Sequence, residues 1–265
     1  MYDFNYQRPT SLDAAAKSVA AAEDGKYLAG GMTLIPTMKQ RLAQPSDLID
    51  LSAIAELSGI RREGDELVIG ATTTHAEVAA SEEVRSAIPA LAALADHIGD
   101  PAVRARGTIG GSIANADPAA DYPAAVVGLG ATVQTNTRSI AADDFFTGLF
   151  ETALGEAELV TAVRFPIPAR AGYVKFPNPA SRYAVVGVLV CESSGGTRVA
   201  VTGAGPSVFR VADMEKALAS DFSPKAVEGI SVAASGLNSD IHASDEYRAH
   251  LVTVMAKRAV AAATA

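Results

Sequence analysis

The stretch Tyr27–Leu51, YLAGGMTLIPTMKQRLAQPSDLIDL, carries the clearest fold signal in the chain. Its apolar start predicts a short strand over Lys26–Ala29, and the apolar spacing of Leu34–Leu42 is typical of a helix. A second apolar run at Asp47–Leu51 predicts another strand. The stretch therefore indicates a small β-α-β unit. Its first turn holds Gly30-Gly31, where the chain must turn tightly or pass close to a ligand.

Composition and charge exclude several classes of protein. The 265 residues are 49% hydrophobic and 20% charged, an ordinary globular balance. A net charge of −8 and scattered Lys and Arg argue against a nucleic-acid binder, which would carry a basic face. The start has no signal-peptide pattern, and the longest apolar run, Ala124–Val133, is too short and too glycine-rich to span a bilayer. We therefore expect a cytoplasmic protein.

The cysteine and histidine residues predict no metal site on this chain. Cys191 is the only cysteine, so the chain alone can hold neither a disulfide nor an iron–sulfur cluster. The four histidines lack metal-ligand spacing, and no G-x-S-x-G motif is present. We expect no catalytic side chain of hydrolytic or metal chemistry.

Turn residues and periodicity divide the rest of the chain. A helix over Ser11–Ala22 precedes the β-α-β unit, and a hairpin with strands at Ser58–Arg62 and Glu66–Gly70 follows it. Two prolines and a glycine make Phe165–Gly172, FPIPARAG, a candidate domain boundary. Strands followed by helices beyond it indicate an α+β fold. The other expected helices are Thr74–Ala80, Glu83–Gly99, Ala119–Val127, Val211–Ala219, Pro224–Leu237 and Asp245–Ala263, and the other expected strands are Ala131–Thr135, Glu158–Phe165, Tyr173–Phe176, Ala184–Cys191 and Thr197–Gly203.

A second glycine-rich stretch, GTIGGS at Gly107–Ser112, lies in a predicted loop. Glycine turns that begin helices bind phosphate well, because backbone N–H groups point outward and no Cβ intervenes. Two such loops could hold one pyrophosphate from both sides, although a plain turn is the commoner use of the first loop alone. Neither stretch fits G-x-G-x-x-G or the P-loop pattern, which excludes Rossmann and P-loop chemistry.

Four motifs occur in order along the chain: AGGMTLIPTMKQRLAQPSDLIDL, GATTTHAEV, IGDPAVRARGTIGGSIANADPAADYPAA and YVKFPNPASRYAVVGV. With them the chain closely resembles, over essentially its whole length, the FAD-binding medium subunit of molybdenum hydroxylases, of the aerobic carbon monoxide dehydrogenase and xanthine dehydrogenase type. The resemblance implies a vanillyl-alcohol-oxidase-like (PCMH-type) fold in which two α/β lobes clasp FAD. It places an FAD-binding domain at 1–168, with lobes of about 1–56 and 57–168, and at 169–265 a flavoprotein C-terminal domain of antiparallel sheet and helices.

The same resemblance implies that both glycine stretches contact the FAD pyrophosphate. The hydroxyls of Thr108 and Ser112 are then available to phosphate or ribityl oxygens. Many relatives have Asn in place of Ser112, so its shorter side chain could bind through a water. The implied contacts here are Ala29, Gly30, Gly31, Met32, Thr33 and Leu34 in the first stretch, and Thr108, Ile109, Gly110, Gly111 and Ser112 in the second.

Further positions match family contacts, several of them beside a plainer alternative. Asp121 is expected on the cofactor rather than as a helix cap, whereas Asp117 could be only a cap, and we reject the two as an acid–base pair. Ile98 is expected near the flavin, or else in the core at a helix end, and Val160 is expected to pack against the cofactor. Lys175 and Tyr183 match a flavin lysine and an aromatic cover for the ring, or else a strand lysine and a sheet tyrosine. Asn115 also falls on a contact position, and Arg182 is expected in a salt bridge.

The predicted function is that of an electron-transfer flavoprotein subunit. By resemblance, FAD would take electrons from [2Fe–2S] clusters of a small partner chain and pass them to an acceptor such as quinone. A large partner would hold the molybdenum cofactor and the substrate, whether carbon monoxide, a purine, an N-heterocycle or an aldehyde, in a dimer of heterotrimers. Two alternatives are a stand-alone flavin oxidase or reductase, for which His75 is a formal attachment candidate, and an assembly protein without flavin.

Overall fold

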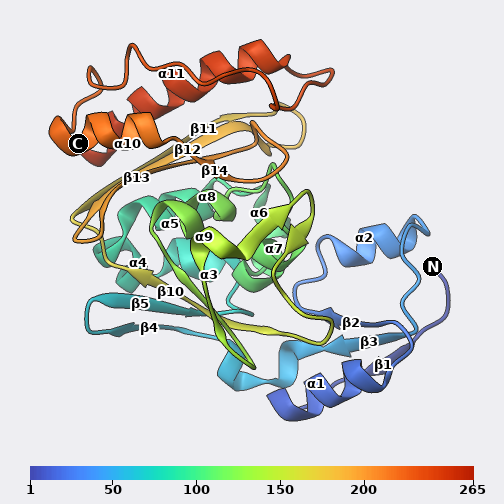
Figure 1. The fold of residues 1–265 in the computed structure, drawn as a ribbon. Coiled ribbons are helices and arrows are strands. Elements are labelled where there is room, and N and C mark those ends of the chain that lie inside the picture. The colour runs from blue at the N-terminus through green and yellow to red at the C-terminus, as the bar shows by residue number, and fades with distance from the viewer.

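The computed structural model describes residues 1–265 and places three sheet-centred units one after another. In Figure 1 the N-terminal sheet lies at the lower right and the last sheet, with its covering helices, lies at the top. A five-stranded sheet and a group of short helices lie between them. No helix is long and apolar enough to cross a membrane.

The N-terminal unit confirms the predicted β-α-β arrangement. Strand β2 (Gly25–Leu28) pairs in parallel with β3 (Asp47–Asp50), and α2 (Leu34–Lys39) connects them. Helix α1 (Leu12–Ala21) begins where expected, because Ser11 Oγ accepts a hydrogen bond from the Ala14 N–H. Strand β1 (Asn5–Gln7), which was not predicted, pairs with the other edge of β3; its three residues are polar and exposed and give no apolar signal.

The middle unit is an antiparallel sheet in the order β4-β5-β10-β6-β7. The predicted hairpin is present, and helices that follow it in the chain pack on the sheet. Their buried residues form one core of 31 with residues of the last sheet such as Leu189 and Ala200. Its strands are β4 (Ile60–Glu63), β5 (Glu66–Gly70), β6 (Thr132–Thr135), β7 (Ser139–Ala141) and β10 (Val160–Pro166), with a small pair β8 (Phe146–Gly148) and β9 (Glu151–Thr152); its helices are α3 (His75–Ala80), α4 (Glu82–Ala87), α5 (Pro89–Asp96), α6 (Pro101–Arg106), α7 (Ile109–Asn115), α8 (Tyr122–Gly128) and α9 (Ala142–Phe145).

Three predictions in this unit were wrong in detail. The single helix expected over Glu83–Gly99 is two helices, α4 and α5, because Pro89 ends the first and starts the second. The GTIGGS stretch, which keeps the name second glycine loop, is mostly helical, since α7 begins at Ile109 with Thr108 as its N-cap. Helix α8 begins only at Tyr122, because Asp117 Oδ1 accepts from the Ala119 N–H and holds a turn there.

The last unit is an antiparallel sheet in the order β11-β12-β13-β14. Helix α11 (Asp245–Ala263), predicted at the same bounds, packs on β11 and β12, while α8 contacts the sheet from the middle unit. The helix expected over Pro224–Leu237 is absent: only turns occur there, and Gly236 has a positive φ of 88°. The remaining elements are β11 (Arg170–Pro177), β12 (Ala184–Ser193), β13 (Gly196–Thr202), β14 (Phe209–Arg210) and α10 (Ala212–Ser220).

Candidate functional site

A cleft of about 970 Å³ brings together segments that are far apart in the sequence. Fifteen of the seventeen predicted cofactor residues line it, and only Ile109 and Lys175 do not. Its walls come from the loop after β2, the start of α7, the turn before α8, the segment between β9 and β10, and the loop between β11 and β12. The predicted residues that line the cleft are Ala29, Gly30, Gly31, Met32, Thr33, Leu34, Ile98, Thr108, Gly110, Gly111, Ser112, Asn115, Asp121, Val160 and Tyr183.

The first glycine loop, residues 29–34, presents unpaired donors to this cleft. The backbone N–H groups of residues 30–33 donate to no oxygen of the protein. A Cβ on Gly30 would lie 2.0 Å from the carbonyl oxygen of Arg106, so this glycine lets the loop pack against the end of α6. Gly31 has a φ of 73°, a left-handed conformation that other residues adopt at a cost. The two glycines thus serve close packing and turn shape, and the free amides result.

The second glycine loop, residues 107–112, is arranged differently. Its Gly110 N–H donates to Ala71 O at 2.8 Å, and Ile109 N–H donates to Thr73 O at 3.1 Å. A Cβ on Gly110 would lie 2.6 Å from the Ala71 Cβ, so this glycine permits contact with the residue that follows β5. Ile109 is fully buried in the core and points away from the cleft. What this loop offers the cleft is side chains.

The polar side chains on α7 have no acceptor or donor of their own in the protein. Ser112 and Asn115 line the cleft, and the Ser112 hydroxyl and the Asn115 amide make no hydrogen bond to another residue. Thr108 Oγ1 accepts from the Gly111 N–H at 3.1 Å and keeps its own hydroxyl proton for another acceptor. Together with the first glycine loop, these groups make one end of the cleft rich in donors.

Asp121 sits at the cleft with a buried pair of partners behind it. Its Oδ1 lies 2.5 Å from the Tyr173 hydroxyl and its Oδ2 lies 3.0 Å from Lys175 Nζ, which also donates to His97 O. Burial raises the pKa of Asp121, and the Lys175 ammonium opposes that rise. Asp121 stands at the N-cap position of α8, but its side chain makes no capping hydrogen bond there. Lys175 lies behind Asp121 rather than at the cleft, and no sequence pattern indicated Tyr173.

The loop between β11 and β12 contributes Tyr183 and Arg182 to the cleft mouth. Asn178 Oδ1 accepts from the N–H groups of Ala180 and Ser181 and gives the loop its shape. Tyr183 lines the cleft and is 44% exposed, as a residue at an entrance would be. Arg182 has a φ of 63° and no carboxylate within ion-pair distance, so the expected salt bridge is wrong.

His75 lines the cleft from the start of α3, where Thr74 is the N-cap in a capping box. The residue is 5% exposed, its ring Nδ1 has no hydrogen-bond partner, and its backbone N–H donates to Gly107 O at 2.9 Å. Burial, with the charge of Arg104, lowers the pKa of His75 to about 4, so the ring is neutral at pH 7. Its burial and its backbone hydrogen bond to Gly107 of the second glycine loop favour a structural role for His75 over flavin attachment.

Sequence reasoning missed one whole wall, the segment between β9 and β10. Leu154, Gly155, Glu156, Glu158 and Leu159 line the cleft there. Only Gly155 distinguishes this stretch from an ordinary polar loop, and no motif marks it. Its place at the cleft depends on pairing of β10 with β5 and β6, which local sequence does not specify.

Comparison with known proteins gives one consistent result. Residues 2–168 match the family described as the FAD binding domain in molybdopterin dehydrogenase. The nicotine 6-hydroxylase medium subunit of Paenarthrobacter nicotinovorans is 37% identical over 98% of this chain and 97% of its own length. The carbon monoxide dehydrogenase medium chain of Hydrogenophaga pseudoflava is 36% identical over 99% and 97%. A solved carbon monoxide dehydrogenase from the same organism, lacking the Mo-pyranopterin moiety, superimposes with a TM-score of 0.90 at 36% identity, covering 99% of this chain and 98% of the other.

Proposed function

The chain belongs to the family of FAD-binding domains of molybdopterin dehydrogenases, and from that premise we propose that its cleft holds one FAD and serves electron transfer. It is an oxidoreductase subunit of the FAD-binding medium type. The observation that carries the proposal is that residues 30–33, whose N–H groups are unpaired, line the same cleft as Ser112 and Asn115 of α7, whose side chains are also unpaired. Such a donor set fits a pyrophosphate.

The residues present fit the rest of the cofactor as well. Ile98 and Val160 add apolar surface to the cleft, which the buried Asp121 and the half-exposed Tyr183 also line. When bound, FAD supplies the redox chemistry, accepting electrons and releasing them to an acceptor. The chain binds and orients the cofactor, Tyr183 limits access at the mouth, and Asp121 with Lys175 sets the local charge.

We propose the same partners that the family resemblance implies. A chain with one cysteine holds no iron–sulfur cluster of its own, so electrons would come from [2Fe–2S] clusters of a small subunit. A large subunit would carry the molybdenum-pterin cofactor and the substrate site, in a dimer of heterotrimers with quinone or another external acceptor. The proposed division is a PCMH-type FAD domain at 1–168, with lobes near 1–56 and 57–168, and a C-terminal domain at 169–265.

The test is to purify the chain alone and in its native complex. We expect visible flavin absorption and one releasable FAD per folded chain, and iron and molybdenum that co-purify with two further subunits. A folded chain that neither carries FAD nor takes it up on addition contradicts the binding proposal. Flavin in a chain that never associates with iron or molybdenum proteins supports the stand-alone oxidase or reductase instead.

A further inference from the structure

The segment 153–159 joins β9 to β10 and forms one wall of the cleft without belonging to a helix or strand. It also touches the opposite side of the cleft. Leu159 packs in the N-terminal core with Ile49 and Leu51, and Ala157 O accepts a hydrogen bond from the Tyr27 hydroxyl at 2.9 Å. The conformation of this segment therefore helps to set the spacing between the N-terminal unit and the middle unit.

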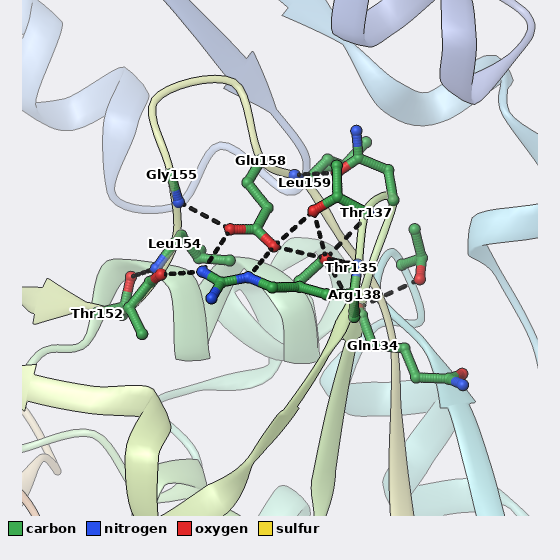
Figure 2. Close-up of polar contacts among 12 residues, drawn as sticks. Gln134, Thr135, Thr137, Arg138, Thr152, Leu154, Gly155, Glu158 and Leu159 are labelled. Carbon is green, nitrogen blue, oxygen red and sulfur yellow. Dashed lines mark hydrogen bonds and ion pairs between the residues drawn. The ribbon is translucent and has the colours of Figure 1, made fainter.

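Glu158 is the centre of the contacts that hold the segment (Figure 2). Its Oε1 lies 2.7 Å from the Thr135 hydroxyl and 2.9 Å from the Thr137 hydroxyl. Its Oε2 accepts the Gly155 N–H at 2.8 Å, which closes the segment on itself. The side chain is only 6% exposed, and the pKa of its carboxyl is held far below its usual range, first by Arg138 and then by the other donors.

Arg138 donates hydrogen bonds to residues near both ends of the segment. Its Nε and Nη2 donate to the two oxygens of Glu158, each at 2.9 Å, and Nη2 also donates to Ala153 O at 2.6 Å. Such a two-pronged arginine–carboxylate contact fixes geometry as well as charge. Asn136 in the same turn adds two backbone-level contacts to Leu159, one through its N–H and one through its Oδ1. The turn between β6 and β7 thus fixes the position of the segment through these hydrogen bonds.

We propose that Glu158 and Arg138 are positioning residues that hold the 153–159 wall over the bound cofactor and so slow its release. The inference rests on the proposed function, because it assigns the cleft to FAD. Neither residue need carry charge to the flavin: Glu158 has its oxygens occupied by Arg138, Gly155 and the two threonines. Their substitution should therefore change the rate of FAD release and leave the potential of bound FAD unchanged.

The chain offers a matched control in another carboxylate–arginine pair. Glu215 accepts from Arg210 Nε and Nη2 at 2.8 and 2.7 Å and from the Val199 N–H at 3.0 Å. Its side chain is 12% exposed, and it does not line the cleft. Glu158→Gln and Glu215→Gln thus remove the same kind of charge from the same kind of pair, and only one pair touches the cleft wall.

The experiment measures FAD release from the full chain by flavin fluorescence, and hydrogen exchange of the peptide spanning residues 153–159. We expect Glu158→Gln to release FAD roughly tenfold faster than wild type, because charge-assisted hydrogen bonds to the wall are lost. Exchange in the segment should accelerate, since glutamine keeps only one of the two oxygens that accept from Gly155, Arg138 and the two threonines. Glu215→Gln should alter neither quantity, even where both variants melt at the same lower temperature, and the redox potential should stay at the wild-type value in both.

Equal release rates in Glu158→Gln and Glu215→Gln would overturn the inference. If Glu158→Gln does not fold, Arg138→Lys and Thr137→Val decide the matter, because each removes a part of the contact and each should speed release. Exchange on the chain without FAD separates this inference from the proposed function. If the wild-type chain binds no FAD, the proposed function is contradicted. If the wild-type chain binds FAD and hydrogen exchange in Glu158→Gln equals that of wild type, only the positioning role is contradicted.

Discussion

The two glycine loops are alike in sequence and opposite in use. In the first, residues 29–34, the N–H groups of residues 30–33 are unpaired, and all four residues line the cleft. In the second, residues 107–112, the N–H groups of Ile109, Gly110, Gly111 and Ser112 are all taken by oxygens of the protein. The first loop supplies backbone donors, and the second supplies side chains on a tightly packed support.

This difference shows that a Gly-Gly pair does not by itself identify a ligand contact. Gly110 is needed because the backbone at Ala71 lies against it, which is a packing requirement independent of any cofactor. Gly31 is needed because its φ is positive, which sets the direction of the neighbouring amides. A substitution at Gly110 should therefore act first on folding, and one at Gly31 first on cofactor binding.

The largest expected effect comes from Lys175→Met, behind Asp121. It leaves the carboxylate of Asp121, 4% exposed, without its cation, and removing one partner of a buried pair costs about 3–5 kcal/mol. At a pH where Asp121 stays ionised, the uncompensated negative charge should also lower the potential of bound FAD by some tens of millivolts. Thermal unfolding and redox titration measure the two effects.

The double variant Lys175→Met with Asp121→Asn provides the control for that prediction. It removes both charges, so most of the lost stability and the shift in potential should return. A double variant as unstable as the single one would mean that Lys175 acts through packing.

Asp121→Ala alone should weaken FAD binding roughly ten- to a hundredfold if the carboxylate accepts hydrogen bonds from the cofactor.

Gly110→Val should be next, with a loss of about 3 kcal/mol in unfolding free energy. The added Cβ would meet Ala71 backbone atoms, which cannot move aside as a flexible side chain would. Gly229→Val is the comparison, since nothing lies within 4 Å of a Cβ there. Chemical denaturation without FAD measures both. If Gly110→Val were as stable as wild type, the second loop would have more freedom than its geometry indicates.

Local sequence predicted most elements and failed where distant contacts decide. Helix α11 was predicted at its observed bounds, and in the structure Ser244 caps its start. The stretch Pro224–Leu237 has a similar apolar content yet forms only turns, and its glycines and serines do not suffice to show this in advance. Strand β1 pairs only through β3, so its three polar residues carry no signal of their own.

The site shows the same limit more sharply. Resemblance predicted residues that the structure gathers at one cleft, but not which backbone groups stay unpaired. The contact between Asp121 and Lys175 spans 54 positions, and that between Arg138 and Glu158 joins two loops with no motif between them. Such pairs follow from sheet register, which depends on the whole fold.

A smaller effect on stability is expected from protonation of the buried His75 ring. The backbone N–H of the same residue donates to Gly107 O in the second loop. The pKa of His75 is about 4 in the folded chain and 6.5 when unfolded, so below pH 6.5 the unfolded chain binds the extra proton first. Stability should fall as pH drops from about 6.5 to about 4, by at most 1.4 kcal/mol per pH unit, and level off below that. His75→Phe should lack this slope between the two values, in melting curves recorded across the range, while a slope equal to that of wild type would show that other groups are responsible.

The smallest expected change in stability accompanies the most specific change in function, at Gly31 of the first loop. Gly31→Ala places a Cβ at a φ of 73° and 3.0 Å from an Ile35 side-chain carbon, which should cost about 1–2 kcal/mol. The strain is relieved by rotating the peptide groups beside it, and those groups carry the unpaired amides. We therefore expect FAD affinity to drop roughly tenfold or more, as one or two hydrogen bonds to the pyrophosphate are lost.

Met32→Ala, in the same loop but without the backbone change, should retain wild-type affinity. FAD titration of both variants, with circular dichroism to verify folding, measures the difference. If Gly31→Ala bound FAD as tightly as Met32→Ala, the unpaired amides would not be the cofactor's main contact, and the contrast between the two loops would lose its functional meaning.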